Sequence, residues 1–150
     1  MKPLARTRIL FAIGAALMAF GASKLLAQLF LASWDHASAG HADIAARGVW
    51  LLAMFLPLLS ILSACVAAGL TVLLTRRVGL SFTARMVPAI IGASTGALAI
   101  AFAADPTVLV LRFLPGSIYY GVSIAVALGV FAGGLLTVVH LGRTVAPAAA

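Results

Sequence analysis

The chain has 150 residues, of which 64% are hydrophobic and only 9% charged, whereas soluble domains are about half apolar and about a quarter charged. A soluble fold of this size buries only about 70% of the surface of its unfolded chain, so the excess apolar residues need lipid as their solvent. The net charge of +7 does not indicate a nucleic-acid partner, because the basic residues gather at the ends of apolar runs. Composition therefore predicts an all-α integral membrane protein, with residues 1–150 forming a single domain.

The first apolar run, residues 9–32, follows a short basic arm and predicts the first membrane crossing. It resembles a signal peptide, but its apolar character resumes after Lys24, so we expect an uncleaved helix. Lys24 lies about 10 Å from the outer end of this helix, near enough for its ammonium group to reach the lipid headgroups. The alternative is a buried, functional charge within the membrane.

Residues 33–47 form the most polar stretch, and their low positive charge predicts a loop on the outer face. Four of its side chains are of types that bind zinc or copper, namely Asp35, His36, His41 and Asp43. The two histidines are five residues apart and do not share a helical face, but a flexible loop could fold them around an ion. We expect a solvated loop, with a metal site as the alternative.

The second crossing is predicted over residues 49–75, a run longer than a hydrocarbon core of about 30 Å requires. Pro57 predicts a kink, because proline removes a backbone donor. Small and hydroxyl-bearing residues then recur at helical spacing and predict a face that packs on other helices: Ser60, Ser63, Ala64, Ala67 and Thr71. Cys65, the single cysteine, is interpreted as a small packing residue.

The basic turn at residues 75–85 carries three arginines and no acid, which predicts that it lies on the cytoplasmic side. Both termini then also lie in the cytoplasm, in a bacterial inner membrane. The third crossing is predicted over residues 86–104, and it contains a GxxxG pair, Gly92 and Gly96, suited to close helix packing.

Asp105 and Pro106 are typical of a helix start, and they predict a short helix over residues 107–114. This helix is too short to span the membrane and is expected to be interfacial or shallowly re-entrant. The fourth crossing is predicted over residues 118–141. Along it, small residues recur at every fourth position: Gly121, Ala125, Gly129, Gly133 and Thr137. Glycine costs a helix about 1 kcal/mol relative to alanine, so we expect Gly129 and Gly133 to lie in a helix contact that offsets this cost. The pattern leaves open whether the partner is internal or another chain.

Together these elements predict a four-helix transmembrane bundle without a catalytic motif or a required cofactor. The main hypothesis is an accessory or assembly subunit of a larger membrane complex, with the lipid bilayer and other subunits, or copies of itself, as its partners. One alternative is a homo-oligomeric channel or small-solute transporter lined by hydroxyl groups, those of Ser60, Ser63, Thr71, Ser94 and Thr95. The other is an outer-face module that binds a divalent metal through residues 33–47.

Overall fold

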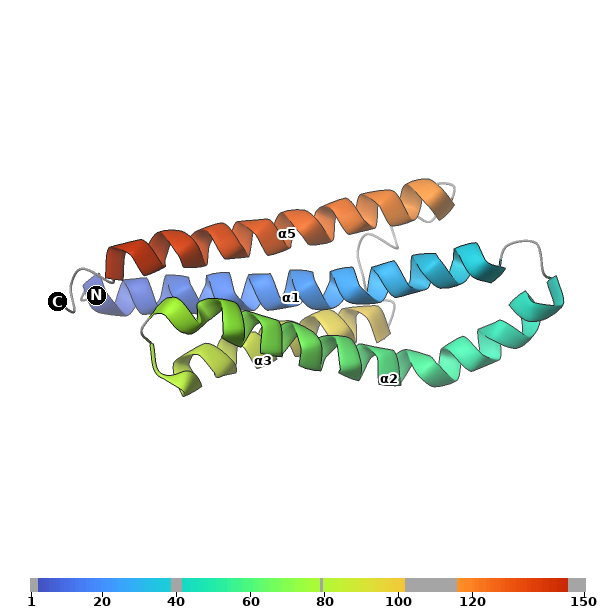
Figure 1. The fold of residues 1–150 in the computed structure, drawn as a ribbon, viewed down its shortest axis with the longest axis horizontal. Helices are drawn as coiled ribbons and strands as arrows, with labels where there is room; N and C mark the ends of the chain where they lie inside the picture. Colours follow the sequence, from blue (N-terminus) through green and yellow to red (C-terminus); the bar gives the residue numbers. More distant parts are fainter. Residues whose placement is uncertain (1–2, 39–41, 79, 102–115, 146–150) are drawn as a thin grey trace.

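The computed structural model describes residues 3–38, 42–78, 80–101 and 116–145. In these residues the chain is entirely helical apart from the short connection before α3, which confirms the all-α prediction. It forms four α-helices and one short 3-10 helix: α1 (Pro3–Ser38), α2 (Ala42–Leu74), η1 (Thr75–Val78), α3 (Phe82–Ala101) and α5 (Gly116–Val145). The α-helices lie side by side along the long axis of the molecule (Figure 1).

The central element is α1, which packs against each of the other three α-helices. On one side it contacts α5, and on the other side α2 and α3, which also pack on one another (Figure 1). The described helices are therefore arranged around α1, and they do not share a common core equally. Small side chains allow this arrangement, because those of Ala15, Ala19, Ala22, Ser23 and Ala27 are all buried and let neighbouring helices approach from several directions.

Small residues lie inside the structure and many large apolar residues lie outside. The largest fully buried side chains include Met18 but are otherwise serines and threonines, whereas Leu136, Leu73 and Ile61 are each more than 60% exposed. Cys65, predicted to pack between helices, is exposed on α2. Among the described residues, the segments Arg6–Leu29 and Gly121–Leu141 are long and apolar enough to cross a membrane, and Leu58–Leu74 is apolar but shorter.

The polar stretch at residues 33–47 is not the long loop that the sequence predicted. The first helix continues to Ser38 and α2 begins at Ala42, so only residues 39–41 of this stretch lie outside the described residues. Alanine, which has the highest helix propensity, recurs through the stretch and favours the continuation of both helices beyond their apolar segments.

The basic turn between α2 and α3 is short and hydrogen-bonded. A guanidinium nitrogen of Arg85 donates to the carbonyl oxygen of Val72 at 3.2 Å, which satisfies a carbonyl near the end of α2. Ser81 accepts from the amide of Ala84 at 3.4 Å through its hydroxyl and from the amide of Arg85 at 3.3 Å through its carbonyl oxygen. Because Ser81 acts as an N-cap, α3 begins at Phe82 rather than at the predicted residue 86.

Two prolines lie within helices. α2 is continuous through Pro57 and bends along its length (Figure 1), as expected where a backbone donor is missing. Pro88 lies in the second turn of α3. The predicted interfacial helix at residues 107–114 lies outside the described residues.

Candidate functional site

The predicted GxxxG pair of α3 lies where this helix crosses α1. A Cβ atom added to Gly92 would overlap with the carbonyl oxygen of Ala16, and one added to Gly96 would lie 2.9 Å from the carbonyl oxygen of Phe20. Both neighbouring atoms belong to the backbone, so they cannot move aside as the end of a flexible side chain can. The two glycines therefore let the backbones of α1 and α3 touch.

A second close contact, between α1 and α5, uses glycines that the sequence analysis missed. A Cβ atom on Gly21 would lie 2.6 Å from the amide nitrogen of Phe131, and one on Gly134 would lie 2.5 Å from that of Met18. Gly14 also faces α5: a Cβ atom added to it would lie 3.0 Å from a side-chain carbon of Thr137. The spacing of seven residues between Gly14 and Gly21, which is about two helical turns, is the signal that could have revealed this face.

Thr137, the last of the five predicted ladder residues of α5, lies against Gly14 of α1. The other four, Gly121, Ala125, Gly129 and Gly133, face away from the rest of the described chain and are called the glycine ladder. All four residues are exposed, and a Cβ atom on any of the three glycines would meet nothing within 4 Å. The neighbouring residue Gly134, not Gly133, makes the contact with α1. An internal contact of Gly129 and Gly133 is therefore not formed among the described residues, and a contact with another chain stays a prediction.

The predicted packing face of α2 is buried. Ser60 and Ser63 are each 4% exposed, and the hydroxyl of Ser63 donates to the carbonyl oxygen of Ser60 at 2.9 Å. The hydroxyl oxygens of Ser63 and Ser23 are 3.5 Å apart and link α2 to α1. Thr71 is also buried, and its hydroxyl donates to a carbonyl of its own helix, that of Ala67, at 2.8 Å.

The hydroxyl groups considered for a shared pore do not converge within this chain. Ser60, Ser63 and Thr71 face inward on α2, whereas Ser94 and Thr95 are exposed on α3. The Thr95 hydroxyl donates to its own helix at 2.7 Å. The hydroxyls that are inside therefore hold helices together, and a pore through one copy of the chain is not formed by this set.

Lys24 is the most unusual buried residue. Its side chain is only 4% exposed, so it does not extend to the surface as the sequence analysis expected. The sequence indicates the depth of Lys24 along its helix but not how completely its face is covered, so it left the buried charge as an alternative only. Gln28, one turn further along the same face of α1, is also 4% exposed.

Two polar atoms between α1 and α5 are buried without a hydrogen-bond partner among the described residues, the side-chain carbonyl oxygen of Gln28 and the hydroxyl of Ser123. The two helices are antiparallel (Figure 1). Gly21 of α1 lies against Ala127 and Phe131 of α5. Gln28 follows Gly21 by two turns and Ser123 precedes Ala127 by one, so both reach the same level of this interface. An unpaired buried polar atom costs about 1–3 kcal/mol, and a small polar solute that bound here would offset this cost.

The predicted metal ligands cannot be placed relative to one another. Asp35 and His36 lie in α1 and Asp43 lies in α2, but their side chains are outside the described residues, as is the whole of His41. Among the side chains that the structure does describe, no three His, Cys, Asp or Glu residues come together. The metal site stays a prediction.

Three features thus lack an explanation within the described chain: the exposed glycine ladder of α5, the unpartnered polar atoms of Gln28 and Ser123, and the buried Nε of Arg85, which also has no hydrogen-bond partner there. The ladder is suited to another helix, and the polar atoms are suited to a hydrogen-bonding solute. Comparison with protein-family models, curated proteins and solved structures finds no match for this chain.

Proposed function

We propose that this chain is a multi-pass protein of a bacterial inner membrane and acts as an accessory or assembly subunit of a larger membrane complex. The long apolar segments of α1 and α5 support the membrane placement. So does the distribution of side chains, with small residues inside and large apolar residues outside, because this arrangement suits lipid as the surrounding solvent. α2 and α3 run beside α1 and would cross with it, which gives four membrane-spanning helices (Figure 1).

Charge supports an orientation with both termini in the cytoplasm. Arg6 and Arg8 lie at the start of α1, and Arg76 and Arg85 lie in or after the turn that follows α2, at the same end of the molecule (Figure 1). The end of α1 and the start of α2 lie at the opposite end (Figure 1). Since positively charged segments stay on the cytoplasmic side during insertion, the basic end would be the inner end.

The glycine ladder of α5 is the observation that carries the subunit proposal. Glycines weaken a helix, yet three of them line a face of α5 where a larger side chain would meet nothing in the described chain. In a membrane, small residues let two helix backbones approach, and this packing drives helix association. We propose that a membrane-spanning helix of a different subunit occupies this face.

The test uses a ladder variant, Gly129→Leu/Gly133→Leu, and a matched control, Gly69→Leu. Gly69 is also an exposed glycine within a helix with open space around it, but it lies on α2. Native mass spectrometry after mild detergent extraction should find the unmodified chain and the Gly69→Leu variant bound to a second subunit, and the ladder variant alone but folded. A stable monomer of the unmodified chain, or a ladder variant that keeps its partner, would contradict the proposal.

A second candidate function, a channel or transporter of small polar solutes, is favoured by the buried polar groups of Lys24, Gln28 and Ser123. An ionisable side chain within a membrane, such as that of Lys24, often marks a solute pathway, and the unpartnered polar atoms of Gln28 and Ser123 could bind a solute along it. The test is flux of glycerol or urea into liposomes that contain only the purified chain. Flux that is abolished by Gln28→Leu and unaffected by Gly69→Leu would favour this candidate, and the absence of flux would remove it.

A further inference from the structure

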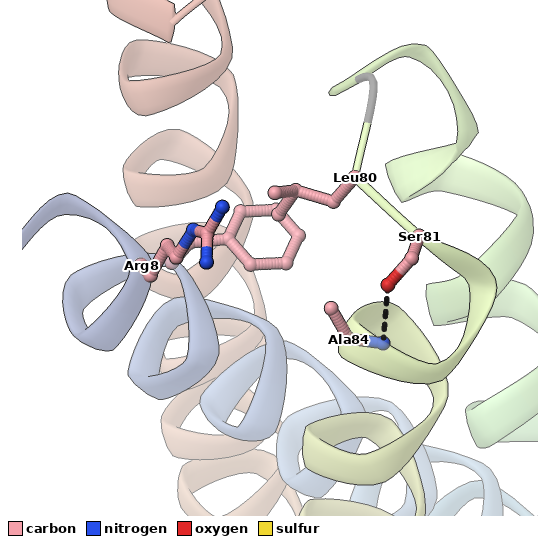
Figure 2. A pocket seen from close by; sticks show the side chains of 5 residues that line it. Arg8, Leu80, Ser81 and Ala84 are labelled. Carbon is pink, nitrogen blue, oxygen red and sulfur yellow. Dashed lines mark hydrogen bonds between the residues drawn. The ribbon is translucent and has the colours of Figure 1, made fainter. Parts of the chain in front are cut away.

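A cavity of about 230 Å³ lies at the basic end of the molecule, between the start of α1 and the start of α3. Five residues line it: Arg8, Phe11, Leu80, Ser81 and Ala84. Arg8 reaches from α1 toward Leu80, and the Ser81 hydroxyl lies against the amide of Ala84 (Figure 2). This cavity is separate from both the glycine ladder and the buried polar atoms of Gln28 and Ser123.

The charge around the cavity favours an anion. Arg8 is exposed and lines it, and Arg6 and Arg76 are also exposed at this end. The three acidic residues of the whole sequence are Asp35, Asp43 and Asp105, and none belongs to the segments that form the cavity. The guanidinium group of Arg8 is therefore not neutralised by a carboxylate of the segments around it.

The shape and chemistry of the lining match a phosphate group attached to an apolar body. A guanidinium group binds two phosphate oxygens at once, and the amino-terminal end of α3 adds the partial positive charge of a helix start. The lining also includes the apolar side chains of Leu80 and Phe11, and Phe11 is only 3% exposed, so it gives the cavity a fixed apolar wall. Pockets for drug-sized ligands are about 300–1,000 Å³, so this smaller cavity suits a headgroup.

We propose that this cavity binds the phosphate headgroup of an anionic phospholipid of the cytoplasmic leaflet, with Arg8 as its principal contact. Free inorganic phosphate shares the charge but would leave the apolar wall unused, whereas the glycerol and first acyl carbons of a lipid cover it. Basic pockets between membrane helices on the cytoplasmic side are suited to such headgroups. The inference rests on the proposed membrane placement and not on the subunit role.

The experiment measures lipid retained by the purified full-length chain in native mass spectrometry, with phosphatidylglycerol or phosphatidylcholine added to the detergent. The variants Arg8→Gln and Arg6→Gln remove the same charge from the same helix, but only Arg8 lines the cavity. We expect phosphatidylglycerol to be retained in preference to phosphatidylcholine, and Arg8→Gln to lower its affinity about fivefold, the value of one basic residue at a membrane surface. Arg6→Gln should have a clearly smaller effect.

Equal losses in the two variants would overturn the inference in favour of diffuse attraction to the basic end. Equal retention of the two lipids would overturn it as well, because the site would then not recognise an anionic headgroup. Displacement of phosphatidylglycerol by an equal concentration of inorganic phosphate would overturn the choice of a lipid. If Arg8→Gln does not fold, Leu80→Trp fills the cavity and keeps every charge, and unchanged retention of phosphatidylglycerol in that variant would also refute the site. Partner binding and membrane fractionation are measured separately, so failure of the lipid site is distinguishable from failure of the proposed function.

Discussion

At the scale of single residues, Gly133 and Gly134 show how two identical neighbours acquire different roles. A Cβ atom on Gly134 would lie 2.5 Å from the amide nitrogen of Met18 and 2.6 Å from the carbonyl oxygen of Gly14, whereas one on Gly133 would meet nothing within 4 Å. The sequence could not distinguish them, because the four-residue spacing that favoured Gly133 says nothing about which face of α5 turns toward α1. The contacts with α1, not the spacing of the glycines, determine which of the two residues must remain a glycine.

The first prediction compares alanine at these two positions. Gly134→Ala should destabilise the purified chain by about 1–3 kcal/mol, because backbone atoms of α1 must move to admit the methyl group. Gly133→Ala should leave the stability unchanged or raise it by up to about 1 kcal/mol through helix propensity. Denaturant unfolding in detergent, followed by circular dichroism, measures both. A Gly133→Ala variant as unstable as Gly134→Ala would show that the ladder packs within the chain.

The second prediction concerns Ser123, whose hydroxyl is buried without a partner among the described residues. Ser123→Ala should be neutral or stabilise the purified chain by up to about 1 kcal/mol, because it removes an unsatisfied buried polar group. Ser63→Ala should instead cost about 1 kcal/mol, since the Ser63 hydroxyl donates to Ser60. Denaturant unfolding in detergent measures the stability of both variants. A large loss of stability in Ser123→Ala would indicate that a bound solute or water satisfies the hydroxyl.

At the scale of helices, the sequence predicted which segments are helical better than it predicted what surrounds them. Long apolar runs are enough to place α1, α2, α3 and α5, although α2 and α3 each contain a proline. Charge and polarity suggested a loop at residues 33–47, but alanine-rich helices extend through most of it. The burial of Lys24 was predicted only as an alternative, because periodicity gives the face of a residue on its own helix and not the elements packed against that face.

The third prediction tests how the turn between α2 and α3 is held. Arg85→Ala should destabilise the purified chain by about 1–2 kcal/mol, because the carbonyl oxygen of Val72 loses a charged donor. Arg76→Ala, a matched control at an exposed position in η1, should leave the stability unchanged. Equal effects of the two variants on the unfolding midpoint would show that only the net charge of the turn matters.

At the scale of the whole molecule, the uneven packing around α1 connects the fold to the proposed role. α5 packs chiefly on α1 and leaves its opposite face, with the glycine ladder, open. The arginines of α1, η1 and α3 gather at one end, where the cavity lined by Arg8 lies. Both proposals, the docking of another subunit and the binding of an anionic lipid, require that the molecule spans a membrane. The basic end must then lie on the cytoplasmic side.

The most direct test of that arrangement is thiol labelling of single-cysteine variants in spheroplasts, in a chain whose only native cysteine is removed by Cys65→Ala. Ser38→Cys, at the end of α1, should react with a membrane-impermeant reagent in intact spheroplasts. Thr83→Cys, at the start of α3, should react only after the membrane is permeabilised. Labelling of Thr83→Cys from outside and Ser38→Cys only from inside would invert the orientation, and recovery of the chain in the soluble fraction would contradict the membrane placement itself.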